Sequence, residues 1–192
     1  MGIAENLIAP LGFLLRKKRA GEARSIRHRQ ELLTHAVFTL ESTSFSDGAR
    51  IPNKYSGIDR GKNISPELHW SRTPEGTQQF LLIMEDIDVP MALPALHVIA
   101  LFEPDIRQLP EGALTADNVQ ISYIPVKHAH GRVGYFGPRP LPGHGIHHYW
   151  FHLYALDFQI ANDHAVTGFD DLLPLLGGHV LAHARFEGIQ KG

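Results

Sequence analysis

The chain has 192 residues, of which 43% are hydrophobic and 20% are charged, and this composition is typical of one globular domain. Its formal net charge of −2 is too balanced to indicate nucleic acid as the main partner. The absence of cysteine excludes disulfides and thiolate chemistry. No stretch approaches the roughly 18 apolar residues that span a membrane, so we expect a cytoplasmic protein with no transmembrane segment.

The first 36 residues differ in charge from the rest of the chain. Residues 1–36 carry a formal charge of +4, whereas residues 37–192 carry −6. Residues 13–33 are rich in helix-favouring side chains and predict a helix. The apolar run precedes the basic residues, the reverse of a secretory signal. We expect a basic helical extension that packs on its own domain or on a second copy, giving a homodimer, with anionic lipid as the alternative.

Residues 37–192 form the predicted main domain, in which short apolar runs alternate with loops rich in proline and glycine. Such runs predict strands, and the continuous ones indicate strands buried on both faces. Helices are expected only near the ends, so the pattern favours a mostly β fold of two packed antiparallel sheets. The predicted strands are 37–40, 80–84, 97–102, 119–126, 149–158 and 184–189, with a helix at 170–183.

Two segments carry an unusual density of polar groups. Asp86 and Asp88 follow the buried run 80–84 and would repel each other without hydrogen-bond donors or a cation. The stretch 134–149 holds a rigid loop whose glycines leave backbone N–H groups accessible. Histidines beside the acids suggest a device in which each carboxylate accepts from one ring nitrogen, while the other nitrogen donates to an anion. A tight structural turn with incidental polar residues remains the alternative.

Thirteen histidines raise the question of a metal site. His128 and His130 would share one face of a strand, but no acid follows them closely, and a solvent-facing loop is the simpler interpretation. His147 and His148 are adjacent and would point to opposite faces of a strand. We therefore expect no metal and no cofactor.

Four motifs in order resemble the phosphatidylethanolamine-binding protein family, which includes Raf kinase inhibitor protein and bacterial relatives. The acid pair ending at Pro90 is similar to the family's Asp-Pro-Asp-Ala-Pro signature. Residues 137–149 are similar to its Gly-Pro…Gly-x-His-Arg-Tyr signature, and residues 63–70 to its Asn-x-Ser-Pro-x-Leu-x-Trp stretch. His97 stands where the family has a histidine at the start of a strand. Residues 1–36 lie outside the resemblance.

The resemblance implies a β-sandwich with peripheral helices and a pocket for phosphate, acetate or a phospholipid head group. Its departures are Ile87 between the acids, His148 in place of the arginine, and Ala95-Leu96 where a tryptophan is often found. These departures leave the anion site in place, but the resemblance then does not identify the molecule to which the anionic group belongs. The ligand-binding residues it implies are Asp86, Asp88, Pro90, His97, Gly137, Pro138, His147 and Tyr149.

Binding of a small anionic ligand is therefore the favoured function. The alternatives are regulation of a protein partner such as a kinase, a metalloprotein, and an enzyme in which His147, Asp86 and Asp88 act as acid and base. The sequence shows no positioned nucleophile and assigns no catalytic residue.

Overall fold

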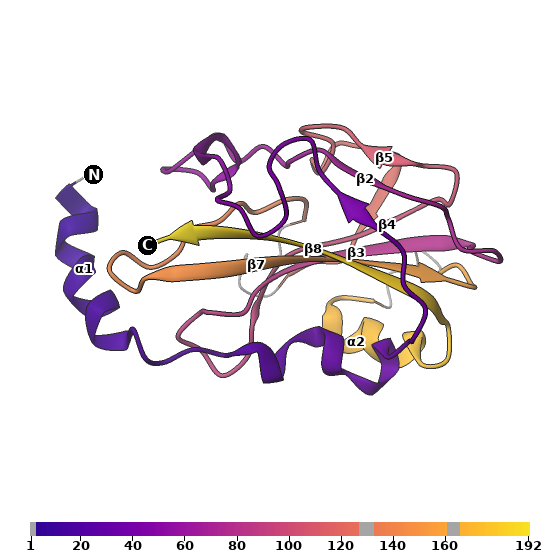
Figure 1. The fold of residues 1–192 in the computed structure, drawn as a ribbon, viewed down its shortest axis with the longest axis horizontal. Helices are drawn as coiled ribbons and strands as arrows, with labels where there is room; N and C mark the ends of the chain where they lie inside the picture. Colours follow the sequence, from indigo (N-terminus) through magenta and orange to yellow (C-terminus); the bar gives the residue numbers. More distant parts are fainter. Residues whose placement is uncertain (1–2, 127–132, 161–165) are drawn as a thin grey trace.

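A computed structural model describes residues 3–126, 133–160 and 166–192, which form two antiparallel sheets as predicted (Figure 1). The larger sheet has five strands in the order β6-β4-β3-β7-β8, and the smaller has three in the order β1-β2-β5. The large-sheet strands are β3 (Gln79–Asp86), β4 (Ala95–Phe102), β6 (Ile121–Tyr123), β7 (Ile146–Leu156) and β8 (Val180–Lys191). The small-sheet strands are β1 (Leu40–Glu41), β2 (Leu68–Trp70) and β5 (Gln108–Leu109).

The central strand β3 is buried along its whole length, because both faces of the large sheet are covered. Side chains alternate across a strand, so Phe80, Leu82 and Met84 face the small sheet, while Leu81 and Ile83 face the other way. β3 pairs with β4 on one side and with β7 on the other. The predicted buried runs 80–84 and 97–102 are therefore neighbouring strands, and the end of β3 is fixed between β4 and β7.

The second face of the large sheet is covered by the later part of the N-terminal arm, which we define as residues 3–33, and by helices near the C terminus (Figure 1). Ile26 and Leu32 from the arm pack there with Leu172 and Leu176. Glu85 anchors the arm, since its carboxylate accepts hydrogen bonds from the Ser25 hydroxyl and the Ile26 N–H. The arm is thus part of the second core.

The predicted helix at 13–33 is wrong in position. The structure has an α-helix at α1 (Ile3–Leu15), followed by three 3₁₀ turns at Glu22–Arg24, Ile26–His28 and Gln30–Leu32. The second and third turns place Ile26 and Leu32 on the sheet, whereas the first buries no side chain. Packing on the sheet therefore overrides local helix propensity in this segment.

The predicted helix at 170–183 is also too long. It consists of α2 (Phe169–Leu172) and a 3₁₀ turn (Leu173–Leu176), and it ends at the glycine pair 177–178. Gly178 has a φ of +84°, which stops the helix and lets β8 begin at Val180. β8 pairs along the whole of β7, and this long-range pairing makes it longer than the predicted strand 184–189.

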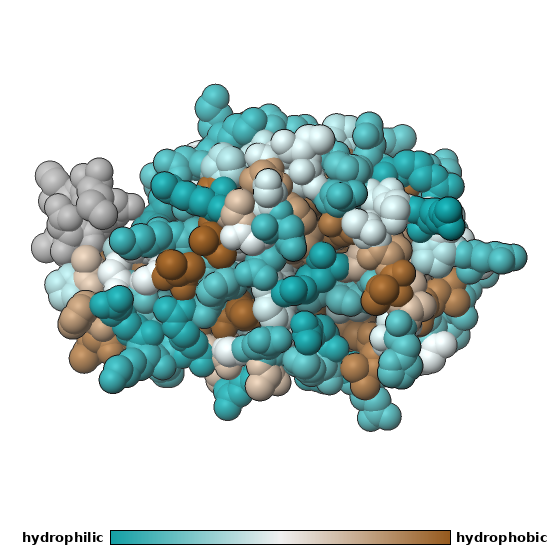
Figure 2. All heavy atoms as spheres, viewed as in Figure 1, coloured by the Kyte–Doolittle hydropathy of each residue, from teal (hydrophilic) through white to brown (hydrophobic). Residues whose placement is uncertain are grey.

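The outward side of α1 is apolar. Leu11, Phe13 and Leu14 are 52%, 67% and 79% exposed, and Figure 2 shows apolar side chains over the end of this helix. Exposed apolar groups of this kind are typical of surfaces that bind a protein or a membrane. The predicted homodimer and the lipid alternative both stay predictions. No helix in the described ranges is long and apolar enough to cross a membrane.

Candidate functional site

Antiparallel pairing of β3 with β7 brings the first acid and the histidine–tyrosine motif together. Asp86 is the register partner of Tyr149. His147 lies two residues before Tyr149 on the same face, and its Nδ1 is 2.7 Å from Asp86 Oδ2. The side chains of Asp86, His147 and Tyr149 are all buried, with exposed fractions of 2%, 1% and 0%. This pair of strands therefore builds the centre of the candidate site.

A β-bulge adds His97 to the same group. Met84 pairs with Val98 and Glu85 pairs with Leu96, so His97 is the extra residue that the ladder leaves out. A bulge changes the direction in which a side chain points and is common beside functional sites. The His97 ring lies edge-on to Tyr149 with centroids 5.3 Å apart.

The ring nitrogen Nδ1 of His97 is held by a backbone carbonyl. Its Nδ1 donates to the Phe136 carbonyl at 2.5 Å. Burial lowers the pKa of His97, although the charge of Asp86 opposes this effect. The Nδ1 proton of His97 is therefore directed at a backbone carbonyl, and burial favours the neutral ring.

Asp88 lies at the edge of the site, where three donors meet it. His148 donates to Oδ2 from its backbone N at 2.8 Å and from its ring Nδ1 at 2.6 Å. Arg19 donates to Oδ1 at 2.5 Å. Burial alone would raise the pKa of Asp88, but the bonds from His148 and Arg19 outweigh it and lower that pKa. The Asp88 backbone N–H also donates to Asp86 Oδ1 at 2.8 Å, so the acids are linked.

His144 extends the site through a chain of hydrogen bonds that fixes the proton positions. Its Nε2 lies 2.9 Å from the Leu15 carbonyl and 3.1 Å from the Lys18 carbonyl, and carbonyls only accept, so Nε2 carries hydrogen. Burial, followed by the charge of His147, lowers the pKa of His144 and favours the neutral ring, whose Nδ1 then accepts. His147 Nε2 donates to that atom at 2.8 Å while His147 Nδ1 donates to Asp86. With His144 neutral, both ring nitrogens of His147 are therefore used, one towards His144 and the other towards Asp86.

The Tyr149 hydroxyl is the unsatisfied group of the site. It is buried, and it has no partner of hydrogen-bond geometry among the described residues. Burial raises the pKa of Tyr149 well above its usual value, and Asp86 raises it further through its charge and through a contact with the hydroxyl that falls short of full hydrogen-bond geometry. A buried hydroxyl without a partner is costly, so its retention is a feature expected of a ligand-binding group.

The loop before β7 forms the rim next to His97. Asn63 Oδ1 accepts from the Gly137 N–H at 2.9 Å, and the Pro138 carbonyl accepts from the Gly57 N–H at 3.0 Å. A Cβ at Gly137 would collide with the Tyr55 carbonyl, so glycine is required for this close approach. Pro90, the remaining residue of the predicted set, is half-buried at the end of the acidic segment.

The structure thus brings Asp86, His97, His147 and Tyr149 together, with Asp88 beside them. The acids were expected to hold His97 and His147, but Asp88 holds His148 and Arg19. Sequence reasoning missed His144 and Arg19. The position of His144, three residues before His147, was a signal that could have identified it. Nothing in the local sequence marks Arg19 as a site residue.

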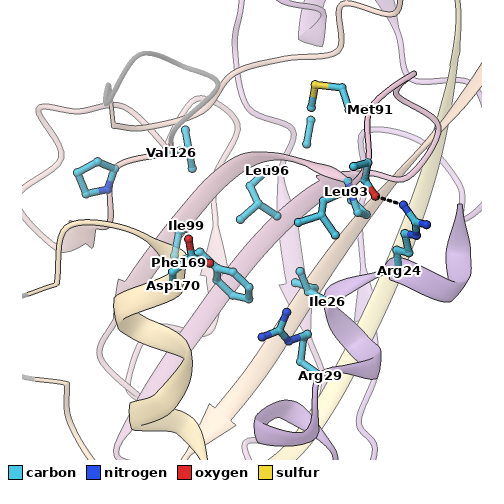
Figure 3. A pocket seen from close by; sticks show the side chains of 14 residues that line it. Arg24, Ile26, Arg29, Met91, Leu93, Leu96, Ile99, Val126, Phe169 and Asp170 are labelled. Atoms are coloured by element: carbon cyan, nitrogen blue, oxygen red, sulfur yellow. Dashed lines mark hydrogen bonds between the residues drawn. The ribbon is translucent and has the colours of Figure 1, made fainter. Parts of the chain in front are cut away.

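No cluster of three or more metal-binding side chains occurs among the described residues. His128 and His130 lie outside those residues. A separate cavity of about 340 Å³ opens between the arm, the β3–β4 loop and α2 (Figure 3). Its walls are mainly apolar, and none of the predicted site residues lines it. The labelled lining residues are Arg24, Ile26, Arg29, Met91, Leu93, Leu96, Ile99, Val126, Phe169 and Asp170.

The family model of the phosphatidylethanolamine-binding proteins matches residues 41–191, and the chain belongs to this family. A UPF0098 protein from Aquifex aeolicus is 35% identical over 156 residues, which cover 81% of this chain and 90% of the relative. The crystal structure of a phosphatidylethanolamine-binding protein homologue from Chlamydia trachomatis has a TM-score of 0.70 and 32% identity, covering 81% of this chain and 98% of the other.

Two further relatives add fold and context. Escherichia coli YbcL matches with a TM-score of 0.71 and 24% identity over 82% of this chain and 99% of its own, which supports the fold. A Mycobacterium tuberculosis protein named as the lipoprotein LppC is 34% identical over 130 residues, covering 68% of this chain and 61% of the relative. Because one relative bears a lipoprotein name, the cytoplasmic location stays a prediction.

Proposed function

We propose that the protein binds a small anionic group, such as phosphate, a carboxylate or a phospholipid head group, at the site around His147. Membership of a family of binding proteins agrees with this role. The observation that carries the proposal is the buried Tyr149 hydroxyl, which makes no hydrogen bond of full geometry among the described residues and lies beside the ring of His147. A histidine donor and a hydroxyl donor in one buried place favour an anion.

The two acids do not repel such a ligand, because their oxygens are already used. Asp86 accepts from His147 and from the Asp88 N–H, and Asp88 accepts from Arg19 and His148. Their role is to fix the histidines and to balance their charge. No catalytic step is required of any of these groups.

Calorimetric titration with inorganic phosphate, and separately with glycerophosphoethanolamine, tests the proposal. His147→Ala removes the histidine donor and should weaken binding about 10- to 100-fold, the effect of losing a hydrogen bond to a charged group. His179→Ala is the matched control, since His179 forms a similar 2.8 Å pair with Asp157 at the surface. Equal affinity of wild type and His147→Ala would refute the proposal.

A further inference from the structure

The candidate site is closed in this structure. Its charged and polar side chains, from Asp86 to Tyr149, are between 0% and 7% exposed. α1 stands beside the loop that leads into β7, and the two backbones touch at Gly12 and Gly143 (Figure 1). The arm therefore lies against the loop that carries His144.

His144 occupies the donor that an anion would need. Nδ1 of His147 is bonded to Asp86, so only Nε2 can reach a ligand, and that atom donates to His144 Nδ1 at 2.8 Å. An anion accepting from the same atom would compete with the lone pair of His144. Anion binding by His147 therefore requires that His144 move away.

The arm holds His144 in this blocking position. The Leu15 and Lys18 carbonyls, at the end of α1 and just beyond it, both accept from His144 Nε2. Arg19 donates to the carbonyls of His144 and Ile146 at 3.3 Å and 2.7 Å, and it also reaches Asp88. Four hydrogen bonds thus connect residues 15–19 to the loop and a fifth connects them to the acid pair.

The fit of α1 against the loop depends on two glycines. A Cβ at Gly12 would collide with the Pro142 carbonyl, and a Cβ at Gly143 would collide with the Ala9 carbonyl. Gly12 is buried within a helix whose neighbours at 11, 13 and 14 are exposed. The helix backbone therefore approaches the loop backbone as closely as glycine permits.

We infer that residues 8–19 form a cap that closes the anion site and that opens to admit its ligand. This inference rests on the proposed function and adds regulation of the same site. In the closed form the cap satisfies His144 and Arg19, and in the open form His147 Nε2 becomes available. The apparent affinity for an anion is then reduced by the fraction of molecules that are open.

Gly12→Ala tests the cap without weakening the helix, because alanine favours helix more than glycine. The added methyl should undock α1 and increase phosphate affinity about tenfold if some nine-tenths of molecules are closed. Gly168→Ala is the matched control, since nothing lies within 4 Å of a Cβ at that position. Arg19→Gln removes the hydrogen bonds that hold the other end of the cap to the loop, and it should likewise increase phosphate affinity.

Hydrogen–deuterium exchange of residues 140–148 reports the cap independently of any ligand. Faster exchange together with tighter phosphate binding in Gly12→Ala, but not in Gly168→Ala, is the expected result. Faster exchange with equal or weaker binding would overturn the cap as a barrier, and so would unchanged exchange in both Gly12→Ala and Arg19→Gln. Absence of phosphate binding in wild type and in both opened variants would refute the proposed function itself.

Discussion

Replacing Tyr149 by phenylalanine should change stability and binding in opposite directions. Tyr149 is 0% exposed, and its hydroxyl makes no hydrogen bond of full geometry among the described residues. The folded protein therefore bears the desolvation cost of this hydroxyl. Removing it should raise the free energy of unfolding by about 1 kcal/mol, the lower part of the range for an unsatisfied buried group. The same change removes a donor to the proposed anion and should weaken phosphate binding about 10- to 100-fold.

Tyr154→Phe provides the control, because the Tyr154 hydroxyl is also buried without a partner among the described residues but faces the second core. Urea unfolding should show similar stabilisation in both variants, whereas calorimetric titration with phosphate should show weaker binding only in Tyr149→Phe. Equal phosphate affinities in the two variants would refute the assignment of Tyr149 to the site.

Two further predictions concern the buried polar network on the other face of the sheet. Glu85→Ala leaves His152 Nε2, which lies 2.8 Å from the carboxylate, and the donors of the arm without their acceptor. It should cost about 3–5 kcal/mol in urea unfolding, and a loss below about 1 kcal/mol would contradict the anchoring role. Burial lowers the pKa of His183 to about 3, so the unfolded chain binds this proton more readily between about pH 6.5 and pH 3. Stability should therefore fall as pH drops through 6.5, by up to about 1.4 kcal/mol per pH unit from this group, and His183→Gln should flatten the curve measured by thermal unfolding at several pH values.

The loop before β7 contacts both the proposed anion site and the proposed cap. The loop 136–145 holds His97 through the Phe136 carbonyl and keeps glycines close to neighbouring backbone. It must also release His144 when a ligand arrives. Asn63 and Gly57 tie the rim of this loop to the domain, whereas the His144 ring is tied to the arm.

The sequence by itself determined the long strands of the large sheet and pointed to the centre of the candidate site, but it did not predict β2 or β5. The continuous apolar run before Asp86 required a strand buried on both faces, and period-2 alternation placed His147 and Tyr149 on one face with His148 on the other. The glycines and prolines before β7 marked a rigid loop. Each of these features depends only on residues close together in the sequence, so the sequence alone can predict it.

Only the tertiary structure decided which partners complete the site. His97 joins it through a bulge in the β3–β4 ladder, and no residue pattern within β4 specifies a bulge. Arg19 reaches Asp88 across 69 residues, and His144 meets the Lys18 carbonyl across 126. Such contacts depend on how the arm packs against the finished sheet. Local propensity predicted a helix at 13–33, whereas the helix instead ends at Leu15, where its carbonyl meets His144 over the site.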